Sequence, residues 1–274
     1  MEPTKATARY LVRLLITTSI LALTGCTTLP DGSRWGEHAF SSWGTNKITR
    51  AARDAFFHPN TLVPLAGAAV FAIDDFDHKA SDWAVKHTPI FGGEDDARDA
   101  SDDLRALLAI EALATALAAP GGDDFERWTQ AKLKGLAVEA AAVGATYATT
   151  GILKEATDRR RPDRSDDDSF PSGHASASFA YATLANRNLD YMDMPHDLRT
   201  GLQVGNVVLA GGVAWARVEG RKHYPSDVLF GAALGHFLAA FIHDAFLNLP
   251  DNNQTELTAF TAADGAGLQL TVSF

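Results

Sequence analysis

Three short clusters of residues in this chain could bind and transform a phosphate-like anion. The first, residues 154–162, reads Lys-Glu-Ala-Thr-Asp-Arg-Arg-Arg-Pro and closes an apolar stretch. Lys154 and Arg161 are two helical turns apart and would share one helix face, and Pro162 predicts that the helix ends at Arg161. Two cations on one face suit a multiply charged oxyanion. Taken alone, a basic helix end more often complements the helix dipole in solvent.

The second cluster, residues 169–174, reads Ser-Phe-Pro-Ser-Gly-His and leads into an apolar stretch with helical spacing. Ser172 and the free amides of a helix start predict an anion site, and Gly173 allows the backbone to approach the anion closely. His174 would then lie beside the anion, where a general acid belongs. By itself, Pro-Ser-Gly is ordinary turn chemistry.

The third cluster runs from Arg217 through His223 to Asp227, and Pro225 suits the first turn of a following helix. Asp227 lies four residues after His223 and is expected to accept a hydrogen bond from its Nδ1–H. That bond would fix the imidazole tautomer and leave Nε2 as a free nucleophile. In isolation, the same pair is more often a helix cap.

The order of the three clusters resembles the three-part signature of the type 2 phosphatidic acid phosphatase (PAP2) superfamily, which shares its site with vanadium haloperoxidases. The resemblance covers about a quarter of the chain and implies an all-α helical bundle. It also implies a set of phosphate-binding residues. These are Lys154, Arg161, Ser172, Gly173 and Arg217.

The same resemblance assigns the catalytic roles. His223 would attack phosphorus and form a phosphohistidine, Asp227 would orient it, and His174 would protonate the leaving oxygen and then activate water. No metal and no cofactor is implied, because three cationic side chains would stabilise the equatorial oxygens. One departure is visible, since Ala216 stands where the family usually has a serine.

Two other groups of residues invite a metal hypothesis. The acidic runs 94–103 and 163–168 could bind calcium, but neither has an EF-hand pattern, and solvated loops or helix N-termini explain them as well. The run 163–168 could also disfavour highly anionic substrates or pair with nearby arginines. His78 and His87 lie near several carboxylates with irregular spacing, which does not favour a metal site.

Composition and periodicity indicate a helical, globular protein. The 274 residues carry a net charge of −10, which argues against a nucleic-acid partner. Apolar stretches with helical spacing cover residues 61–73, 104–119, 131–153, 175–187, 201–217 and 226–247. Polar residues interrupt these stretches, so a soluble bundle is favoured over a polytopic membrane protein. The interrupting residues are Glu111, Glu139, Asn206, His236 and His243.

Glycine spacing adds one detail about packing. Gly231 and Gly235 lie four residues apart on the last apolar stretch. Such spacing can mark a dimer interface in a membrane, but close packing of this helix within the bundle is the favoured interpretation.

The C-terminal residues have a different period. Residues 255–261 and 267–274 flank Ala-Asp-Gly-Ala, and apolar residues alternate toward the terminal Phe274. The pattern predicts a short β-hairpin turning at Asp-Gly and packed as an edge on the domain. A terminal phenylalanine also resembles the closing strand of outer-membrane barrels, but one hairpin cannot close a barrel.

The N-terminus has the layout of a bacterial lipoprotein signal. Basic residues precede a short apolar run that ends in Leu-Thr-Gly-Cys, with Cys26 as the only cysteine. This resembles a lipobox and predicts lipidation of Cys26; an uncleaved signal anchor is the alternative. Thr27 after the cysteine resembles an outer-membrane address, so we expect a periplasm-facing, lipid-anchored protein of the cell envelope.

The predicted domain organisation is a signal peptide at 1–25, a tether at 26–45, a PAP2-like domain at 46–249 and a tail with a hairpin at 250–274. The expected function is metal-independent hydrolysis of a phosphomonoester or pyrophosphate. A phosphorylated lipid is the favoured substrate, and a small soluble phosphomonoester is the other candidate. Two alternatives are a vanadate-dependent haloperoxidase and a non-catalytic envelope lipoprotein that binds phosphorylated ligands.

Overall fold

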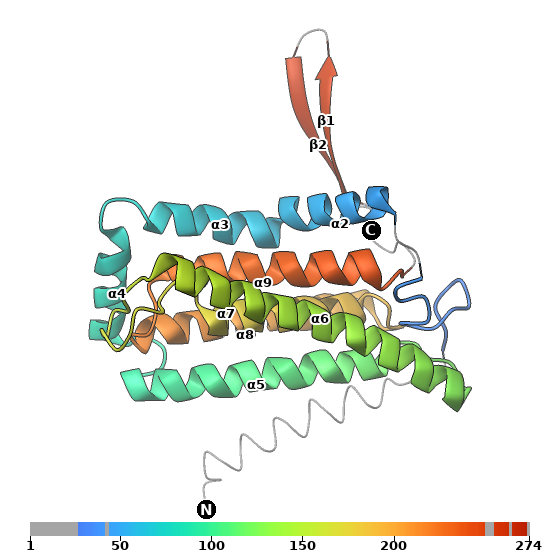
Figure 1. Cartoon of the computed structure of the whole chain (residues 1–274), viewed down its shortest axis with the longest axis horizontal. Helices are drawn as coiled ribbons and strands as arrows, with labels where there is room; N and C mark the ends of the chain where they lie inside the picture. Colours follow the sequence, from blue (N-terminus) through green and yellow to red (C-terminus); the bar gives the residue numbers. More distant parts are fainter. Residues whose placement is uncertain (1–26, 42–43, 250–254, 263–264, 273–274) are drawn as a thin grey trace, which may run out of the picture.

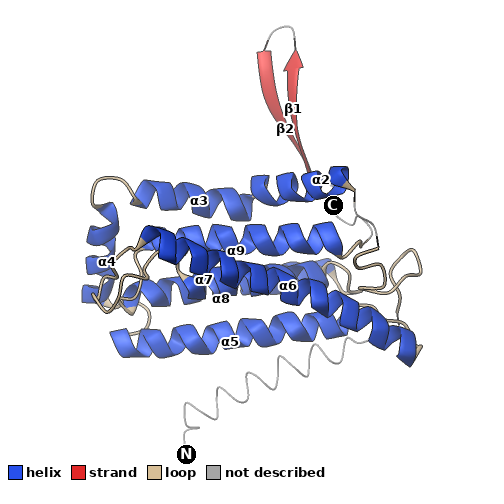
Figure 2. Cartoon of the chain, in the orientation of Figure 1, coloured by secondary structure: helices blue, strands red, loops and turns tan. Residues whose placement is uncertain are grey.

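The computed structural model describes residues 27–41, 44–249, 255–262 and 265–272. Within these ranges the chain forms helices followed by one pair of strands (Figure 2). The helices are α2 (Thr45–Phe57), α3 (Pro59–Phe71), α4 (Phe76–His87), α5 (Glu94–Ala118), α6 (Phe125–Thr157), α7 (Gly173–Leu189), α8 (His196–Glu219) and α9 (Pro225–Phe246).

Most helices run side by side along one long axis, with the short α4 lying across one end (Figure 1). Helix α7 packs most extensively against α9, and α5 and α8 cover its other sides. The loops that carry the three sequence clusters all lie at the end where α4 lies, here called the α4 end (Figure 1). The opposite end, which holds the α5–α6 connection, is called the distal end.

Small residues let α9 lie directly against α7. A Cβ added at Gly235 would come within 2.0 Å of the Ser176 carbonyl oxygen, and one at Gly231 within 2.7 Å of the Ser172 carbonyl oxygen. Neither position can carry a side chain without moving the α7 backbone. This close approach confirms the prediction that the Gly231/Gly235 pair serves packing within the bundle.

The six apolar stretches are confirmed as helices α3 and α5 to α9, while α2 and α4 were missed. Helix α6, however, ends at Thr157 and not at Arg161, because Asp158 takes a left-handed conformation with φ 47°. Lys154 and Arg161 therefore do not share a helix face. Arg161 belongs to the loop that follows α6, and the loop's path brings it back to the site.

The predicted fold class is wrong in its β part. Strands β1 (Thr255–Ala262) and β2 (Gly265–Val272) pair antiparallel with each other. Among the described residues neither strand packs extensively against a helix, and the pair projects away from the bundle (Figure 1). The fold is therefore all-α, and the hairpin is not the packed edge that the sequence predicted, because its two strands pair only with each other.

The segment before α2 lies against the distal end of the bundle. Trp35 is fully buried, and the Lys132 ammonium lies 4.8 Å from the centre of its ring while donating to the carbonyls of Ala116 and Ala119. Lys132 thus satisfies the last carbonyl groups of α5. Residues 27–41, predicted as part of a tether, are held by these contacts. Cys26, the predicted lipidation site, lies outside the described residues.

Two helices, α6 and α9, are long and apolar enough to cross a membrane. The apolar window of α9 is 56% buried, as expected of a core helix, whereas that of α6 is only 28% buried. The polar residues that favoured a soluble bundle do not contradict a membrane location, because all of them face the interior. Those buried residues are Glu111, Glu139, Asn206, His236 and His243.

Candidate active site

His223 lies in the loop between α8 and α9 and is only 2% exposed. Its Nδ1 is 2.7 Å from the main-chain carbonyl oxygen of Ser169. A carbonyl can only accept, so Nδ1 carries the proton and Nε2 keeps its lone pair. Burial, followed by the charges of Arg217, Arg161 and Lys154, holds the pKa of His223 well below its usual value. The ring is therefore neutral at neutral pH, with the lone pair of Nε2 available.

Asp227 does not make the hydrogen bond that the sequence predicted. Its Oδ2 lies 3.9 Å from His223 Nδ1, beyond hydrogen-bond range. Oδ2 instead accepts from the Ser169 hydroxyl at 2.5 Å and from the Tyr224 amide at 2.8 Å. Asp227 thus holds Ser169, whose carbonyl orients His223, so the carboxylate acts on the imidazole through one intermediate residue.

Three cations converge on His223 from different elements: Lys154 from the last turn of α6, Arg161 from the following loop and Arg217 from the last turn of α8. Asp166 pairs with Arg161. Within the described residues, no carboxylate forms an ion pair with Lys154 or Arg217. Lys154 donates to the carbonyl of Asp168, and Arg217 donates to the Ser101 hydroxyl at 3.2 Å. The site therefore has an excess of positive charge.

His174 lies in the first turn of α7, and its Nε2 is 2.8 Å from Asp102 Oδ1 on α5. Burial and the charge of Arg217 lower the pKa of His174 to about 4, although Asp102 opposes the shift. An anion bound among the cations would raise the pKa again, because it neutralises Arg217. We call His174, His223 and the three cations the catalytic cluster.

Ser172 and Gly173 form the start of α7, as predicted. Ser172 is the N-cap, with its hydroxyl 3.4 Å from the Ala175 amide, and it is fully buried. Its amide donates to the carbonyl of Asp227 at 3.0 Å. Gly173 is the first helical residue, so its amide has no acceptor within the helix and can donate to an anion.

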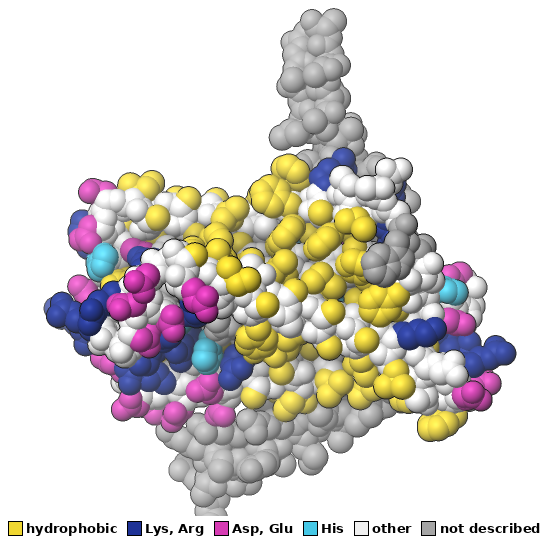
Figure 3. Space-filling model, in the orientation of Figure 1, with side chains coloured by type: hydrophobic (Ala, Val, Ile, Leu, Met, Phe, Trp, Pro, Cys, Tyr) yellow, Lys and Arg dark blue, Asp and Glu magenta, His cyan; other side chains and the backbone are white. Residues whose placement is uncertain are grey.

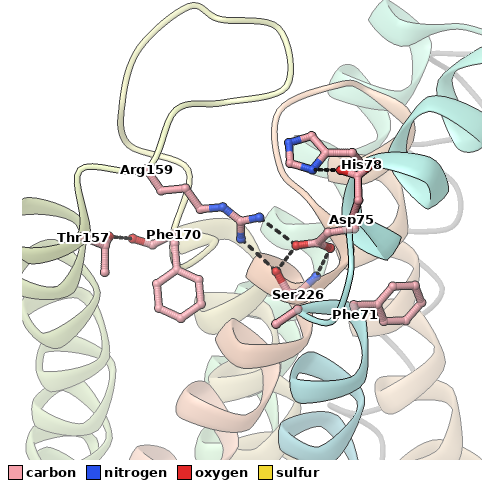
Figure 4. Close-up of a pocket in the computed structure, with 9 residues that line it drawn as sticks. Phe71, Asp75, His78, Thr157, Arg159, Phe170 and Ser226 are labelled. Carbon is pink, nitrogen blue, oxygen red and sulfur yellow. Dashed lines mark hydrogen bonds and ion pairs between the residues drawn. The ribbon is translucent and has the colours of Figure 1, made fainter.

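A buried network behind His223 fixes Asp227. Arg159 donates to Asp227 Oδ1 at 2.5 Å and to Asp77 Oδ2 at 2.7 Å, while Asp77 also accepts from the Ser226 amide at 2.9 Å. Figure 4 shows Arg159 reaching from its loop toward Ser226 at the start of α9. Its guanidinium carbon also lies 4.4 Å from the centre of the Tyr224 ring. These contacts link helix α4 to the loop after α6 and to the start of α9.

The sequence predicted the three cations and both histidines, which the structure brings together, but not the residues whose hydrogen bonds and ion pairs support them. In the sequence, Asp102 is one residue of the acidic run 94–103, and Arg159 is one of three consecutive arginines in the first cluster. Asp77 is one of the carboxylates near His78 that invite a metal hypothesis. No local signal distinguishes them, because their partners lie 67 to 149 residues away in the chain. Ala216 is fully buried in α8.

Comparison with known proteins agrees with this geometry. Residues 136–250 match the model of the PAP2 superfamily. A lipid A 1-phosphatase from Porphyromonas gingivalis is 33% identical over 103 residues, which are 36% of this chain and 22% of that protein. A decaprenylphosphoryl-5-phosphoribose phosphatase from Mycobacterium tuberculosis is 32% identical over 114 residues, covering 38% of this chain and 58% of that protein.

The fold also matches a solved structure, a transmembrane PAP2-type phosphatidylglycerolphosphate phosphatase from Bacillus subtilis. The TM-score is 0.51 at 22% identity, and the match covers 70% of this chain and 94% of that one. The chain spans between about a quarter and just over half of the length of the curated relatives. Residues 136–250 of this chain are thus similar to the PAP2 superfamily, and the curated relatives named here are phosphatases.

Proposed function

We propose that this protein is a phosphatase that hydrolyses a phosphorylated lipid through a phosphohistidine at His223. One observation carries the proposal: a neutral imidazole, with its proton fixed on Nδ1 by the Ser169 carbonyl, lies among three cations. This arrangement suits in-line attack on a phosphoryl group, whose equatorial oxygens the cations stabilise. The names of the relatives support a lipid-linked substrate.

In the first step, Nε2 of His223 forms a bond to phosphorus while the bond to the leaving oxygen breaks. His174 donates its proton to that oxygen. In the second step, His174 takes a proton from water, the water oxygen bonds to phosphorus, and the N–P bond breaks. Inorganic phosphate leaves, and both histidines return to their starting protonation states.

We propose further that the bundle is embedded in a membrane. Large apolar side chains are exposed along the outward faces of several helices, and in Figure 3 they cover the middle of the molecule between two charged ends. Helix α6, whose apolar window is only 28% buried, has 33 residues and is about 50 Å long at 1.5 Å per residue, which exceeds the hydrocarbon core of a bilayer. The exposed apolar residues include Val63 and Val70 of α3, Ile110 and Leu113 of α5, Tyr147 and Ile152 of α6, and Val204 and Val208 of α8.

Lipidation of Cys26 and an envelope location remain part of the proposal. Thr27 accepts a hydrogen bond from the Gly122 amide at 2.9 Å, which places the start of the described chain at the distal end. An acylated Cys26 would anchor that end of the bundle at the membrane. Globomycin sensitivity of processing, read as a mobility shift that Cys26→Ser abolishes, tests the anchor.

The central experiment measures phosphate release by the purified chain from phosphatidate, phosphatidylglycerophosphate, an isoprenyl diphosphate and a soluble phosphomonoester. His223→Ala should abolish release and the acid-labile ³²P label on the protein, while the exposed His196→Ala control keeps both. An unchanged rate in His223→Ala would sink the phosphatase proposal. Halide oxidation after vanadate loading, without phosphate release, would instead indicate a haloperoxidase.

A further inference from the structure

A second cavity of about 340 Å³ adjoins the catalytic cluster and shares Arg161 with it. Besides Arg161, three more arginines line it: Arg160 and Arg164 from the loop after α6, and Arg221 from the loop before α9. Four arginines around one small cavity are unexpected in a chain whose net charge is −10. This cavity differs from the pocket that Figure 4 shows, since His78 is the one lining residue that the two have in common.

Carboxylates nearby neutralise this charge only in part. The nearest partner of Arg160 is Asp167 at 3.9 Å, and that of Arg221 is Glu94 at 4.0 Å. Both distances exceed hydrogen-bond range, and the two arginine side chains are 66% and 47% exposed. Arg164 forms no ion pair with any residue that the structure describes.

Acidic and titratable neighbours of the cavity are few. Asp82 of α4 contributes one carboxylate to the lining, and His78 is paired with Asp75 at 2.9 Å. Asp166 is the partner of Arg161, and Asp163 is engaged by Lys222. Of the four arginines, only Arg161 has a carboxylate within hydrogen-bond range, and Arg164 has none within 4.0 Å among the described residues, so three guanidinium groups can still donate to a bound anion.

Backbone geometry distinguishes two of these arginines from ordinary surface residues. Arg164 has φ 59° and Arg221 has φ 58°, both in the left-handed region that favours glycine. Each conformation costs a non-glycine residue free energy and is held by a turn, with Arg164 N donating to Arg161 O and Arg221 N to Val218 O, both at 3.0 Å. Strained residues of this kind gather at ligand sites.

We propose that this cavity is a second anion subsite, which binds a second phosphate on the same substrate whose scissile phosphate lies at His223. Arg161 would bridge the two anions, and Arg160, Arg164 and Arg221 would bind the second one, since guanidinium groups suit phosphate oxygens. The substrate class is then a lipid diphosphate or a lipid with a second phosphate beside the first. The inference rests on the proposed phosphatase function and adds its specificity.

The test compares the farnesyl monophosphate and diphosphate, which share one lipid chain, as substrates for the wild type and for Arg164→Gln/Arg221→Gln. We expect the wild type to favour the diphosphate. The double variant should lose at least about tenfold in kcat/KM on the diphosphate, since charge-assisted bonds are lost, and change less than about threefold on the monophosphate. Arg53→Gln, at an exposed arginine on α2, is the matched control.

Each other outcome has a defined meaning. If the wild type releases phosphate from neither compound, the phosphatase proposal fails. If it hydrolyses both and the double variant lowers both equally or neither, the subsite proposal alone is overturned. If the double variant only weakens inhibition by free inorganic pyrophosphate, the cavity binds a separate anion, which also overturns a subsite for the substrate.

Arg164→Gly separates recognition from folding. Glycine adopts φ 59° without strain, so this variant should keep or raise the melting temperature while kcat/KM on the diphosphate falls. Retained preference for the diphosphate in a well-folded Arg164→Gly would count against a role for the Arg164 side chain.

Discussion

Two buried polar clusters lie along the same bundle and differ in how their charges are balanced. In the central cluster (His58, Thr183, Arg187, His236 and Asp244), Arg187 meets Asp244 at 2.7 Å and His236 meets the Thr183 hydroxyl at 2.8 Å. The His58 and His236 rings lie 4.6 Å apart. In the catalytic cluster, two of three cations have no carboxylate partner among the described residues.

The difference shows that buried histidines and arginines can either hold helices together or form a site for an anion, depending on their partners. A cation paired with a carboxylate holds helices together, and neither charge is available to a ligand. Cations that surround a neutral imidazole and have no carboxylate partner create a positive potential, which favours the binding of an anion. The excess of charge, more than the presence of histidine, marks the catalytic cluster.

The largest effect should separate the two buried histidines. His223→Ala removes the nucleophile and should lower kcat by at least about 10³-fold, whereas His236→Ala should keep kcat within about tenfold. Phosphate release by protein that passes a size-exclusion and thermal-shift check provides the measurement. Comparable losses in both variants would erase the distinction between the clusters.

The second largest effect should separate one arginine of the catalytic cluster, Arg217, from one of the central cluster, Arg187. Arg217→Ala removes a cation from the phosphate site and should lower kcat by about 10²-fold with little change in melting temperature. Arg187→Ala leaves Asp244 without its arginine, with only His243 Nδ1 at 3.0 Å as a partner, and should cost about 2–3 kcal/mol of stability, below the cost for a fully buried pair because both side chains keep some exposure. Thermal unfolding in detergent and kcat on the folded fraction report the two quantities separately.

A smaller effect tests the helix contact that lies between the clusters. Gly235→Ala would drive a methyl group into the Ser176 carbonyl and displace the start of α7, costing about 1–3 kcal/mol. Gly205→Ala on α8 is the matched control, since its Cβ would meet nothing within 4 Å and alanine favours a helix. An equal melting temperature for both variants would contradict the close α7–α9 packing.

The smallest effect concerns pH. His174, the proposed proton donor, has a pKa of about 4, so kcat/KM should fall as the pH rises above that value and the ring loses its proton. Asp102 favours the protonated ring, so Asp102→Asn should lower this pKa and move the alkaline limb to lower pH. Because Asp102 is 59% exposed, we expect a shift of only about half a pH unit.

The control for the pH experiment is Asp99→Asn, an exposed carboxylate on the same helix. Substrate ionisation is common to both variants and cancels when their profiles are compared. If the alkaline limb of the kcat/KM profile stays in place in Asp102→Asn, or moves to higher pH, Asp102 does not stabilise the protonated ring of His174.

Apolar periodicity predicted six of the eight described helices, because their buried faces repeat at helical spacing. It missed α4, whose sequence is mostly polar, and α2, whose buried residues are two alanines. Periodicity also gave no reliable sign of a membrane location. Polar residues such as Glu111 and His236 interrupt the apolar stretches but face the interior, so they do not show that the helix surfaces contact water. Spacing along one chain cannot tell an inward polar residue from one that interrupts a lipid-facing surface.

By itself the sequence determined the chemistry of the site: two histidines, three cations and a Ser-Gly turn, in an order that few chains share. Only the tertiary structure decided what holds them. Asp227 acts through Ser169, Asp102 reaches His174 from α5, and Arg159 links the loops to α4. Residue types fix what can react, whereas contacts between distant segments fix proton positions and charge balance, which no local pattern encodes.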